Sequence, residues 1–328
     1  MVSEVIAAPV HRMSSARLAA RLLPLALVLS LEGCGSLYVA QAARGQWQVM
    51  RQRRPIAEVI ADPATPEALR AKLTGVTAAR EFASRELGLP DNATYRSYAD
   101  VQRDYVVWNV IAAPEFSVTP RRWCFPIAGC VAYRGYFSEA RARKFADRLR
   151  RGGHDVAVGG VAAYSTLGRF ADPVLSTMTG YGEHDLAAIL FHELSHQVVY
   201  VGGDSAFNEA FAVTVEQAGL ERWLEARGES AGLERYRARR ARQDAYVRAF
   251  ARRRAELAQL YETSLPPDEM RVKKREILAA LAEDMRVLER VHGGRAPYVA
   301  WLAEGLNNAH LASVATYFDL YGDRKSVV

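Results

Sequence analysis

The sequence is poor in the features that mark fibrous, low-complexity and disordered chains. Its 328 residues include only 23 glycines and 13 prolines, and these fractions are well below those of fibrous or low-complexity chains. Long polar tracts are absent and charged residues make up 24% of the chain, which argues against wholesale disorder. Half of the residues are hydrophobic, so the sequence predicts a globular protein with a sizeable core.

Nucleic-acid recognition motifs and repeats of solenoid length are also missing. Nine arginines crowd the segment 235–254, but apolar residues recur there at helical spacing, so we expect an amphipathic helix with a solvated basic face. Removing residues 1–33 takes three arginines and two glutamates from 43 basic and 37 acidic side chains and leaves a net charge of +5. For a protein outside the cytoplasm, this charge favours binding to an anionic membrane surface or to an acidic partner. We expect no binding of nucleic acid.

The N-terminus has the pattern of a signal peptide. Three arginines precede an apolar run from Leu22 to Leu31, which is too short to cross a hydrocarbon core about 30 Å thick. Small residues follow, and we expect residues 1–33 to be removed. The mature chain, residues 34–328, would then form one further domain with a helical C-terminal half.

Cys34 closes a segment, Leu31-Glu32-Gly33-Cys34, that resembles the lipobox of bacterial lipoproteins. Glu32 departs from that pattern. The resemblance implies lipidation of Cys34 and an anchor on the periplasmic face of a bacterial membrane, with Gly35 favouring the outer membrane. The alternative is an ordinary cysteine that follows a cleaved signal.

Only two other cysteines exist, Cys124 and Cys130. The six-residue separation contains a proline and a glycine and can turn back on itself, and an exported compartment is oxidising. We therefore expect a disulfide, with two reduced thiols as the alternative.

The hydrophobic patterns predict an α+β fold that is mostly helical. An early helix is expected over 63–87 with Thr65 as its cap, then strands within 104–118 and 160–166 flanking a helix over 138–152. From Glu183 onward the hydrophobic residues recur with the period of a helix. We expect one helix from Glu183 to Tyr200, a second over 205–227, and then two long helices separated by Pro266-Pro267. We expect a small mixed sheet followed by a helical majority.

The chemistry is carried by His192-Glu193-Leu194-Ser195-His196, a His-Glu-x-x-His pattern on an apolar helix. Residues four apart leave the same helix face, so both imidazoles can bind one metal ion with Glu193 beside its open position. A helix ending at Gly202-Gly203, followed by a second helix capped by Ser205, would place Glu209 opposite His196, each roughly 9 to 10 Å from the turn. His192, His196 and Glu209 would form a catalytic zinc set.

Zinc would make its bound water acidic and polarise a carbonyl, and Glu193 would act as the general base. Glu216 and Asn208 are candidates for orienting a metal-bound histidine, although Glu216 can equally be a solvated charge. An oxyanion donor is also expected, from a set that sequence does not rank: Tyr133, Tyr164, Tyr200 and His310. Tyr164, Ser165 and Thr166 could form an edge strand that pairs with a peptide, or an ordinary strand.

Several of these motifs together resemble the bacterial family of predicted aminopeptidases, a gluzincin-like group of zinc peptidases often found as lipoproteins. The resemblance spans most of the mature chain and rests on the following segments: Gly33-Cys34-Gly35, residues 41–46, Cys124-Phe125-Pro126 through Cys130 to Phe137, residues 164–168, His192 to Gln197, Asn208-Glu209 and Asn307-Asn308-Ala309. It implies a zincin-like core and metal-dependent cleavage of peptides. The C-terminus after Tyr321 departs from the family pattern.

Two other functions are compatible with the sequence. One is a zinc endopeptidase that acts on misfolded or envelope proteins. The other is a non-catalytic lipoprotein in which zinc only joins two helices. An aminopeptidase needs a group that holds the free amine of its substrate, and no Gly-x-Met-Glu-Asn motif supplies one.

Overall fold

The computed structural model describes residues 33–125, 129–166, 168–202, 204–292 and 299–318. The chain divides into two compact units, residues 1–46 and 47–328, so the boundary falls within the first described helix. The elements run in this order: α2 Gly33–Arg51, β1 Arg53–Pro55, α3 Ile56–Ala61, α4 Glu67–Arg85, β2 Ser97–Ala99, β3 Val107–Pro114, β4 Trp123–Phe125, β5 Gly129–Val131, β6 Arg134–Tyr136, α5 Glu139–Arg151, β7 His154–Val161, β8 Val174–Leu175, a 3₁₀ turn Ser176–Met178, α6 Glu183–Ser195, α7 Ser205–Ala226, α8 Ser230–Tyr261, α9 Pro267–His292, α10 Val299–Glu304 and α11 Asn308–Phe318.

The fold is α+β and mostly helical, as predicted: 60% of the residues are helical and the sheets are small. In place of the expected single mixed sheet, the described residues form three separate sheets, β1-β2-β8, β6-β3-β7 and the pair β4-β5. The first of these is mixed and the other two are antiparallel.

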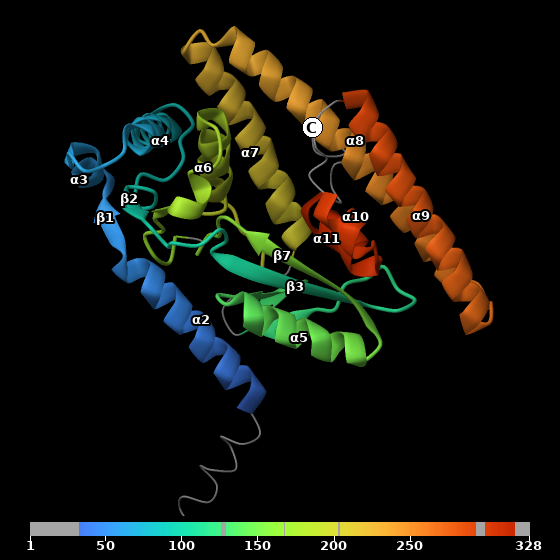
Figure 1. Ribbon diagram of the computed structural model, residues 1–328. Helices are drawn as coiled ribbons and strands as arrows, with labels where there is room; N and C mark the ends of the chain where they lie inside the picture. The colour runs from blue at the N-terminus through green and yellow to red at the C-terminus, as the bar shows by residue number, and fades with distance from the viewer. Residues whose placement is uncertain (1–32, 126–128, 167, 203, 293–298, 319–328) are drawn as a thin grey trace, which may run out of the picture. The chain divides into compact units, whose positions relative to one another are not determined.

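The longest strands, β3 and β7, pair along their whole length, from Val107 opposite Val161 to Pro114 opposite His154. Helix α5 packs on one side of them and α11 on the other (Figure 1). Both faces of β3 are therefore covered, and this explains why its side chains from Asn109 to Ala113 are all buried. Gly160 of β7 lets the Tyr105 ring lie on the strand, because a Cβ at Gly160 would be only 2.3 Å from that ring.

A large core forms where α4, α6 and α7 meet. Its fully buried side chains include Leu73, Leu190, Phe191, Leu220 and Leu224. The helices α8, α9 and α11 enclose a second core around Tyr246, Phe250 and Leu281. The first of these cores packs α6 and α7 against each other.

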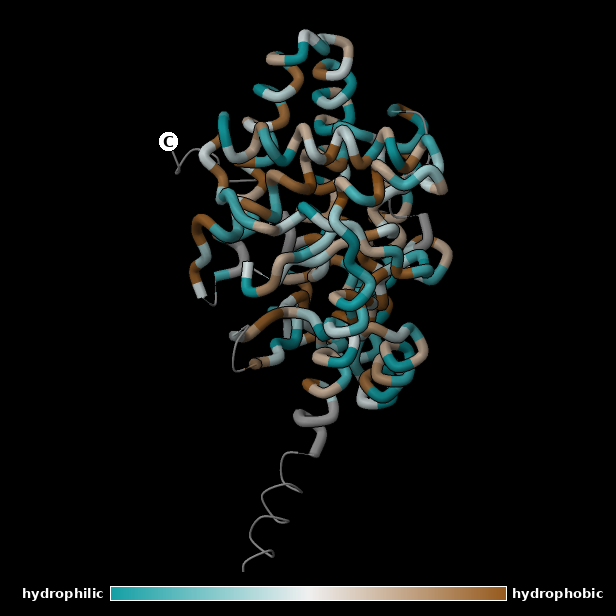
Figure 2. Tube along the Cα trace, turned by 90° about the vertical axis from the view of Figure 1, so that its left-hand side faces the viewer, coloured by the Kyte–Doolittle hydropathy of each residue, from teal (hydrophilic) through white to brown (hydrophobic). Residues whose placement is uncertain are grey.

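The helices α8 and α9 lie side by side (Figure 1). They correspond to the two long helices predicted on either side of Pro266-Pro267. Teal and brown segments alternate along the helices in Figure 2, as expected for elements with one packed and one solvated face. Among the described residues, none of the helices combines the length and apolar character needed to span a bilayer.

Three boundaries differ from the sequence prediction. The first helix of this region, α4, begins at Glu67 with Pro66 at its N-cap position, and Thr65 does not cap it. The Thr65 hydroxyl instead donates to the Val59 carbonyl at 2.7 Å. The second long strand is β7, which ends at Val161 and does not extend to Thr166. The helix expected to reach Tyr200 ends at Ser195.

Candidate metal centre

The two helices that carry the motif run antiparallel. The contacts between them show this direction. His196, which directly follows α6, lies against Glu209 near the start of α7, and His192 lies against Glu216 further along it. Phe191, one residue earlier on α6, lies beside Gly219, which is further along α7 again. The approach is close, because a Cβ at Gly219 would lie 3.1 Å from the Phe191 ring and 2.7 Å from Leu87. Glycine at this position thus permits the helix spacing that the site requires.

The loop between these helices is longer than the tight turn expected from the glycines, and it is held in place by α7. Asn208 accepts a hydrogen bond from the Val201 amide at 2.7 Å and donates one to the Val201 carbonyl at 2.9 Å. Asp204, in place of the predicted Ser205, caps α7 by accepting from the Phe207 amide at 3.0 Å. The buried amide of Asn208 is therefore used to fix the loop and does not orient a histidine ligand.

His192, His196 and Glu209 converge, as the sequence predicts, to form a group that could hold a metal ion. The Nε2 atom of His192 lies 3.3 Å from one Glu209 oxygen, and the Nε2 atom of His196 lies 3.8 Å from the other. All candidate ligand atoms are within 4.8 Å of one another. Tetrahedral zinc with bonds of about 2.0 to 2.1 Å separates its ligand atoms by about 3.4 Å, so this donor set fits such an ion with small adjustments.

Glu216 lies on the far side of His192, where its carboxylate is 3.1 Å from Nδ1. Burial alone would lower the pKa of His192, but hydrogen bonds to Glu209 and Glu216 and the charge of Glu193 outweigh it and raise the pKa to about 10. A carboxylate on Nδ1 leaves Nε2 as the nitrogen that faces the candidate metal position. This is the arrangement in which a neighbouring acid fixes a metal-binding histidine.

His196 has the opposite environment. Burial lowers its pKa to about 4, and the charge of Glu209 offsets this only in part. Its Nδ1 atom is buried and has no hydrogen-bond partner among the described residues. His196 is thus held by packing and stays neutral, the form in which an imidazole binds a metal ion.

The Glu193 carboxylate points into a buried acidic neighbourhood. Burial raises its pKa to about 7, the charges of Glu209 and Asp172 add to that effect, and the charge of His192 and a hydrogen bond from Ser165 oppose it. The Ser165 hydroxyl is therefore a direct partner of the predicted catalytic base. Sequence reasoning placed Ser165 on a substrate-binding strand and did not foresee this contact.

Asp172 fixes the segment that carries Ser165. Its carboxylate accepts from the Thr166 amide at 2.8 Å and from the Thr166 hydroxyl at 2.9 Å, and Asp172 is only 3% exposed. The Asp172 carbonyl in turn accepts from the Tyr95 amide at 2.7 Å. Tyr95 has a positive φ of 60°, and burial, with Glu193 and Asp172 nearby, raises the pKa of its phenol. Neither Asp172 nor Tyr95 belongs to a motif that sequence reasoning could have used.

The four candidate oxyanion donors fall in different places. Tyr133 packs against a small cluster between β3 and α11, and His310 is buried on α11 with its ring 4.9 Å from that of Trp301. Tyr200 lies in the loop after α6 and is 43% exposed. Tyr164 directly precedes Ser165 and packs on Phe137 at 5.8 Å. Of the four, only Tyr164 adjoins a partner of Glu193.

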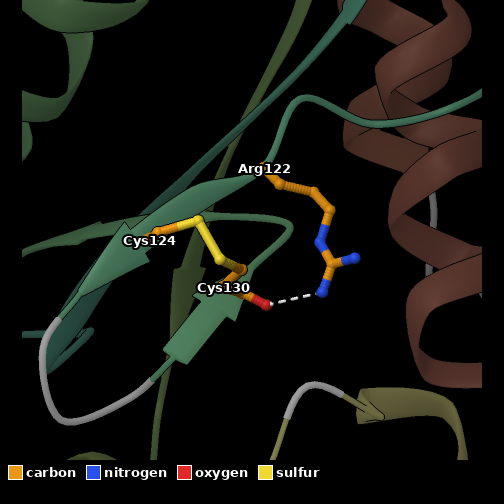
Figure 3. Close-up of a disulfide and its surroundings, with 3 residues drawn as sticks. All are labelled: Arg122, Cys124 and Cys130. Atoms are coloured by element: carbon orange, nitrogen blue, oxygen red, sulfur yellow. Dashed lines mark hydrogen bonds between the residues drawn. A yellow bond between two sulfur atoms is a disulfide. The ribbon is translucent and has the colours of Figure 1, made fainter.

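Cys124 and Cys130 are joined by a disulfide, and their strands β4 and β5 pair with the two cysteines opposite each other. Figure 3 shows Arg122 beside this hairpin, where its guanidinium donates to the Cys130 carbonyl at 3.0 Å. Cys34 falls in the first turn of α2, and the predicted signal peptide, apart from Gly33, lies outside the described residues.

The fold and site together define an α+β protein in which two antiparallel helices present a His-His-Glu group suited to a metal ion. The family model described as "Putative aminopeptidase" matches residues 37–325, so the chain belongs to that family. Comparison with curated proteins and with solved structures gave no match for this chain.

Proposed function

We propose that this protein is a zinc-dependent aminopeptidase with a zincin-like core. The observation that carries the proposal is the position of Glu209, whose two carboxylate oxygens face the Nε2 atoms of His192 and His196. The family description favours a peptidase over other metal-dependent hydrolases. Two imidazoles and one carboxylate form a donor set that favours zinc among the divalent metals.

When bound, zinc would supply an acidic water and a polarised substrate carbonyl. The chain supplies the proton transfer: a Glu193 carboxylate oxygen accepts the proton of the attacking water and later delivers it to the leaving amine. The Ser165 hydroxyl holds that carboxylate in place, and Glu216 holds His192. The buried side chains around the motif, including Leu190 and Leu194, limit the access of bulk water to the base.

The activity can be tested with the purified mature protein on amino-acid arylamides and on internally quenched peptides with blocked N-termini. We expect cleavage of the arylamides alone, its loss after chelation and its return with zinc. Cleavage of blocked peptides would favour an envelope endopeptidase instead. Inactivity on both, in protein that contains stoichiometric zinc, would leave a structural role for the metal.

Glu193→Gln separates catalysis from metal binding. The amide keeps the size of the carboxylate but cannot accept the proton, so we expect a fall in kcat of at least about a hundredfold with unchanged zinc content. Atomic emission measures the zinc content, and arylamide hydrolysis measures kcat. Loss of zinc in this variant would mean that Glu193 is a ligand and would contradict its assignment as the base.

We also propose that the mature protein is attached to the periplasmic face of a bacterial outer membrane through a lipid on Cys34. The basic and apolar N-terminus with its lipobox-like end supports this proposal. Peptides in the envelope would then be the substrates.

A further inference from the structure

A cavity of about 490 Å³ lies between the end of α2 and the segment that follows β2. The residues that line it combine one aromatic residue and two valines with two glutamines and two arginines: Trp47, Val49, Val101, Gln48, Gln52, Arg51 and Arg103. None of the described residues that line the cavity is acidic. A volume of this size accommodates an amino-acid residue, and the mixture of apolar, amide and cationic groups suits the end of a peptide.

Both arginines keep their charge available to a ligand. Arg51 stacks on Trp47 at 4.6 Å, and neither Arg51 nor Arg103 forms an ion pair within the part of the chain that the structure describes. Arg103 is fixed by a 2.9 Å hydrogen bond to the Phe137 carbonyl, while its Nε atom is buried without a partner among the described residues. A guanidinium that is fixed in this way and belongs to a residue lining the cavity can bind the carboxylate of a ligand through charge-assisted hydrogen bonds.

A short series of contacts joins this cavity to the catalytic base. The Arg103 guanidinium lies 5.8 Å from the centre of the Phe137 ring, and that ring lies 5.8 Å from the Tyr164 ring. Tyr164 precedes Ser165, whose hydroxyl bonds to Glu193. The cavity is thus tied by rigid aromatic packing to the segment that positions the base, so its distance from the metal position is fixed.

From this geometry we infer that the cavity binds the free C-terminal carboxylate of a short peptide substrate, with Arg103 as the principal partner and Arg51 at the entrance. The inference rests on the proposed peptidase function. It assigns a substrate class to the protein, short peptides with both ends free. Because the separation of the two sites is fixed, the preference for a free carboxylate should peak at one peptide length.

Kinetics on a peptide series of increasing length, each with a free or an amidated C-terminus, tests this. The wild type should show a kcat/KM about tenfold to a hundredfold higher for the free acid at the preferred length. Arg103→Gln and Arg51→Gln should reduce that ratio. Arg85→Gln, at an exposed arginine of α4, is the matched control and should leave both the ratio and the hydrolysis of amino-acid arylamides unchanged. Equal rates for acids and amides in the wild type would overturn the inference.

Binding gives a readout that does not depend on turnover. Isothermal titration with an N-acetylated peptide of the preferred length, which an aminopeptidase does not cleave, should show tighter binding of the acid than of the amide, and Arg103→Gln should abolish the difference. Arylamide cleavage without this difference would sink the inference and leave the proposed function intact. The difference without any peptidase activity would refute the function and retain the pocket. Arg51→Gln, at an exposed position, keeps the test valid if Arg103→Gln does not fold.

Discussion

At the scale of single residues, the two histidines of one motif are held by different means. His192 lies between two carboxylates, one at each ring nitrogen, whereas packing alone holds His196, with one carboxylate 3.8 Å from its Nε2. The ring of His192 is therefore oriented before a metal ion arrives. A site built in this way has to reorganise less on binding, which favours affinity.

Glu216 should accordingly matter for metal affinity although it is not a ligand. We expect Glu216→Gln to weaken zinc binding by about tenfold to a hundredfold, because the amide is a weaker acceptor for the His192 Nδ1 proton. Competition with a chromophoric chelator measures the affinity. Glu221→Gln, an exposed acid on the same helix, should bind zinc like the wild type. Equal affinity in both variants would show that Glu216 is only a neighbouring charge.

The sequence predicted the residues of the candidate metal centre because a spacing of four on a helix constrains where side chains can point. It could not predict Ser165 or Asp172 as neighbours of Glu193. Those contacts depend on a loop in which Asp172, six residues after Thr166, satisfies the Thr166 amide and hydroxyl. Such pairings follow from tertiary packing and leave no periodic trace in the sequence.

At the scale of elements, the apolar spacing of the motif helix overestimated its length. The pattern continues through Val198, but Val198 is 51% exposed and does not face the core. The Asn208 amide instead binds both backbone groups of Val201 and fixes a loop there. In the same way, β7 ends at Val161, since Thr177 donates to the Ala162 carbonyl, and Asp172 accepts from the Thr166 amide. In both places, side chains form hydrogen bonds with backbone groups that the hydrophobic pattern predicted to be paired within a helix or a strand.

The close approach of α6 and α7 leads to a prediction about stability. Gly219→Ala should destabilise the protein by about 1 to 3 kcal/mol, because the added methyl would meet Leu87 at 2.7 Å and Phe191 at 3.1 Å in a packed core. Urea unfolding followed by circular dichroism measures the change in the free energy of unfolding.

Gly75→Ala on α4 is the control for this substitution. Its added methyl would contact only the flexible Glu183 side chain at 3.1 Å, so the gain in helix propensity should dominate and leave the protein unchanged or more stable. If Gly219→Ala proves as stable as Gly75→Ala, the helix spacing is not set by Gly219.

At the scale of the whole chain, the helical C-terminal half depends on acidic side chains that are ionised in the native state. Asp284 of α9 pairs with Arg252 and Arg253 of α8; burial raises its pKa, but these hydrogen bonds outweigh burial and the net shift is downward. Glu115, after β3, accepts from Arg271 of α9, and this bond lowers its pKa. Both pairs join α9 to its neighbours.

A group with a lowered pKa stabilises the fold fully above its unfolded pKa, and this contribution disappears as the pH falls through the folded value. We therefore expect Asp284→Asn to cost about 1 to 2 kcal/mol at pH 7 and clearly less near pH 2. Urea unfolding at both values measures this difference. Asp147→Asn, at an exposed pair on α5, should change little at either pH. A penalty for Asp284→Asn that does not depend on pH would mean that the side chain acts through packing.

The attachment of the whole chain to a membrane should depend on one residue. No helix in the described part of the chain could span a bilayer, and the net charge of +5 expected for the mature chain supports only a salt-sensitive association. A lipid on Cys34 would instead give attachment that resists salt, because each buried methylene contributes about 0.8 kcal/mol. In a two-membraned bacterial host we expect the wild type to incorporate labelled palmitate and to stay in the outer-membrane fraction after a high-salt wash. Cys34→Ser should lose both properties, while Cys124→Ser should keep the label. Salt-resistant membrane association of Cys34→Ser would refute the lipid anchor.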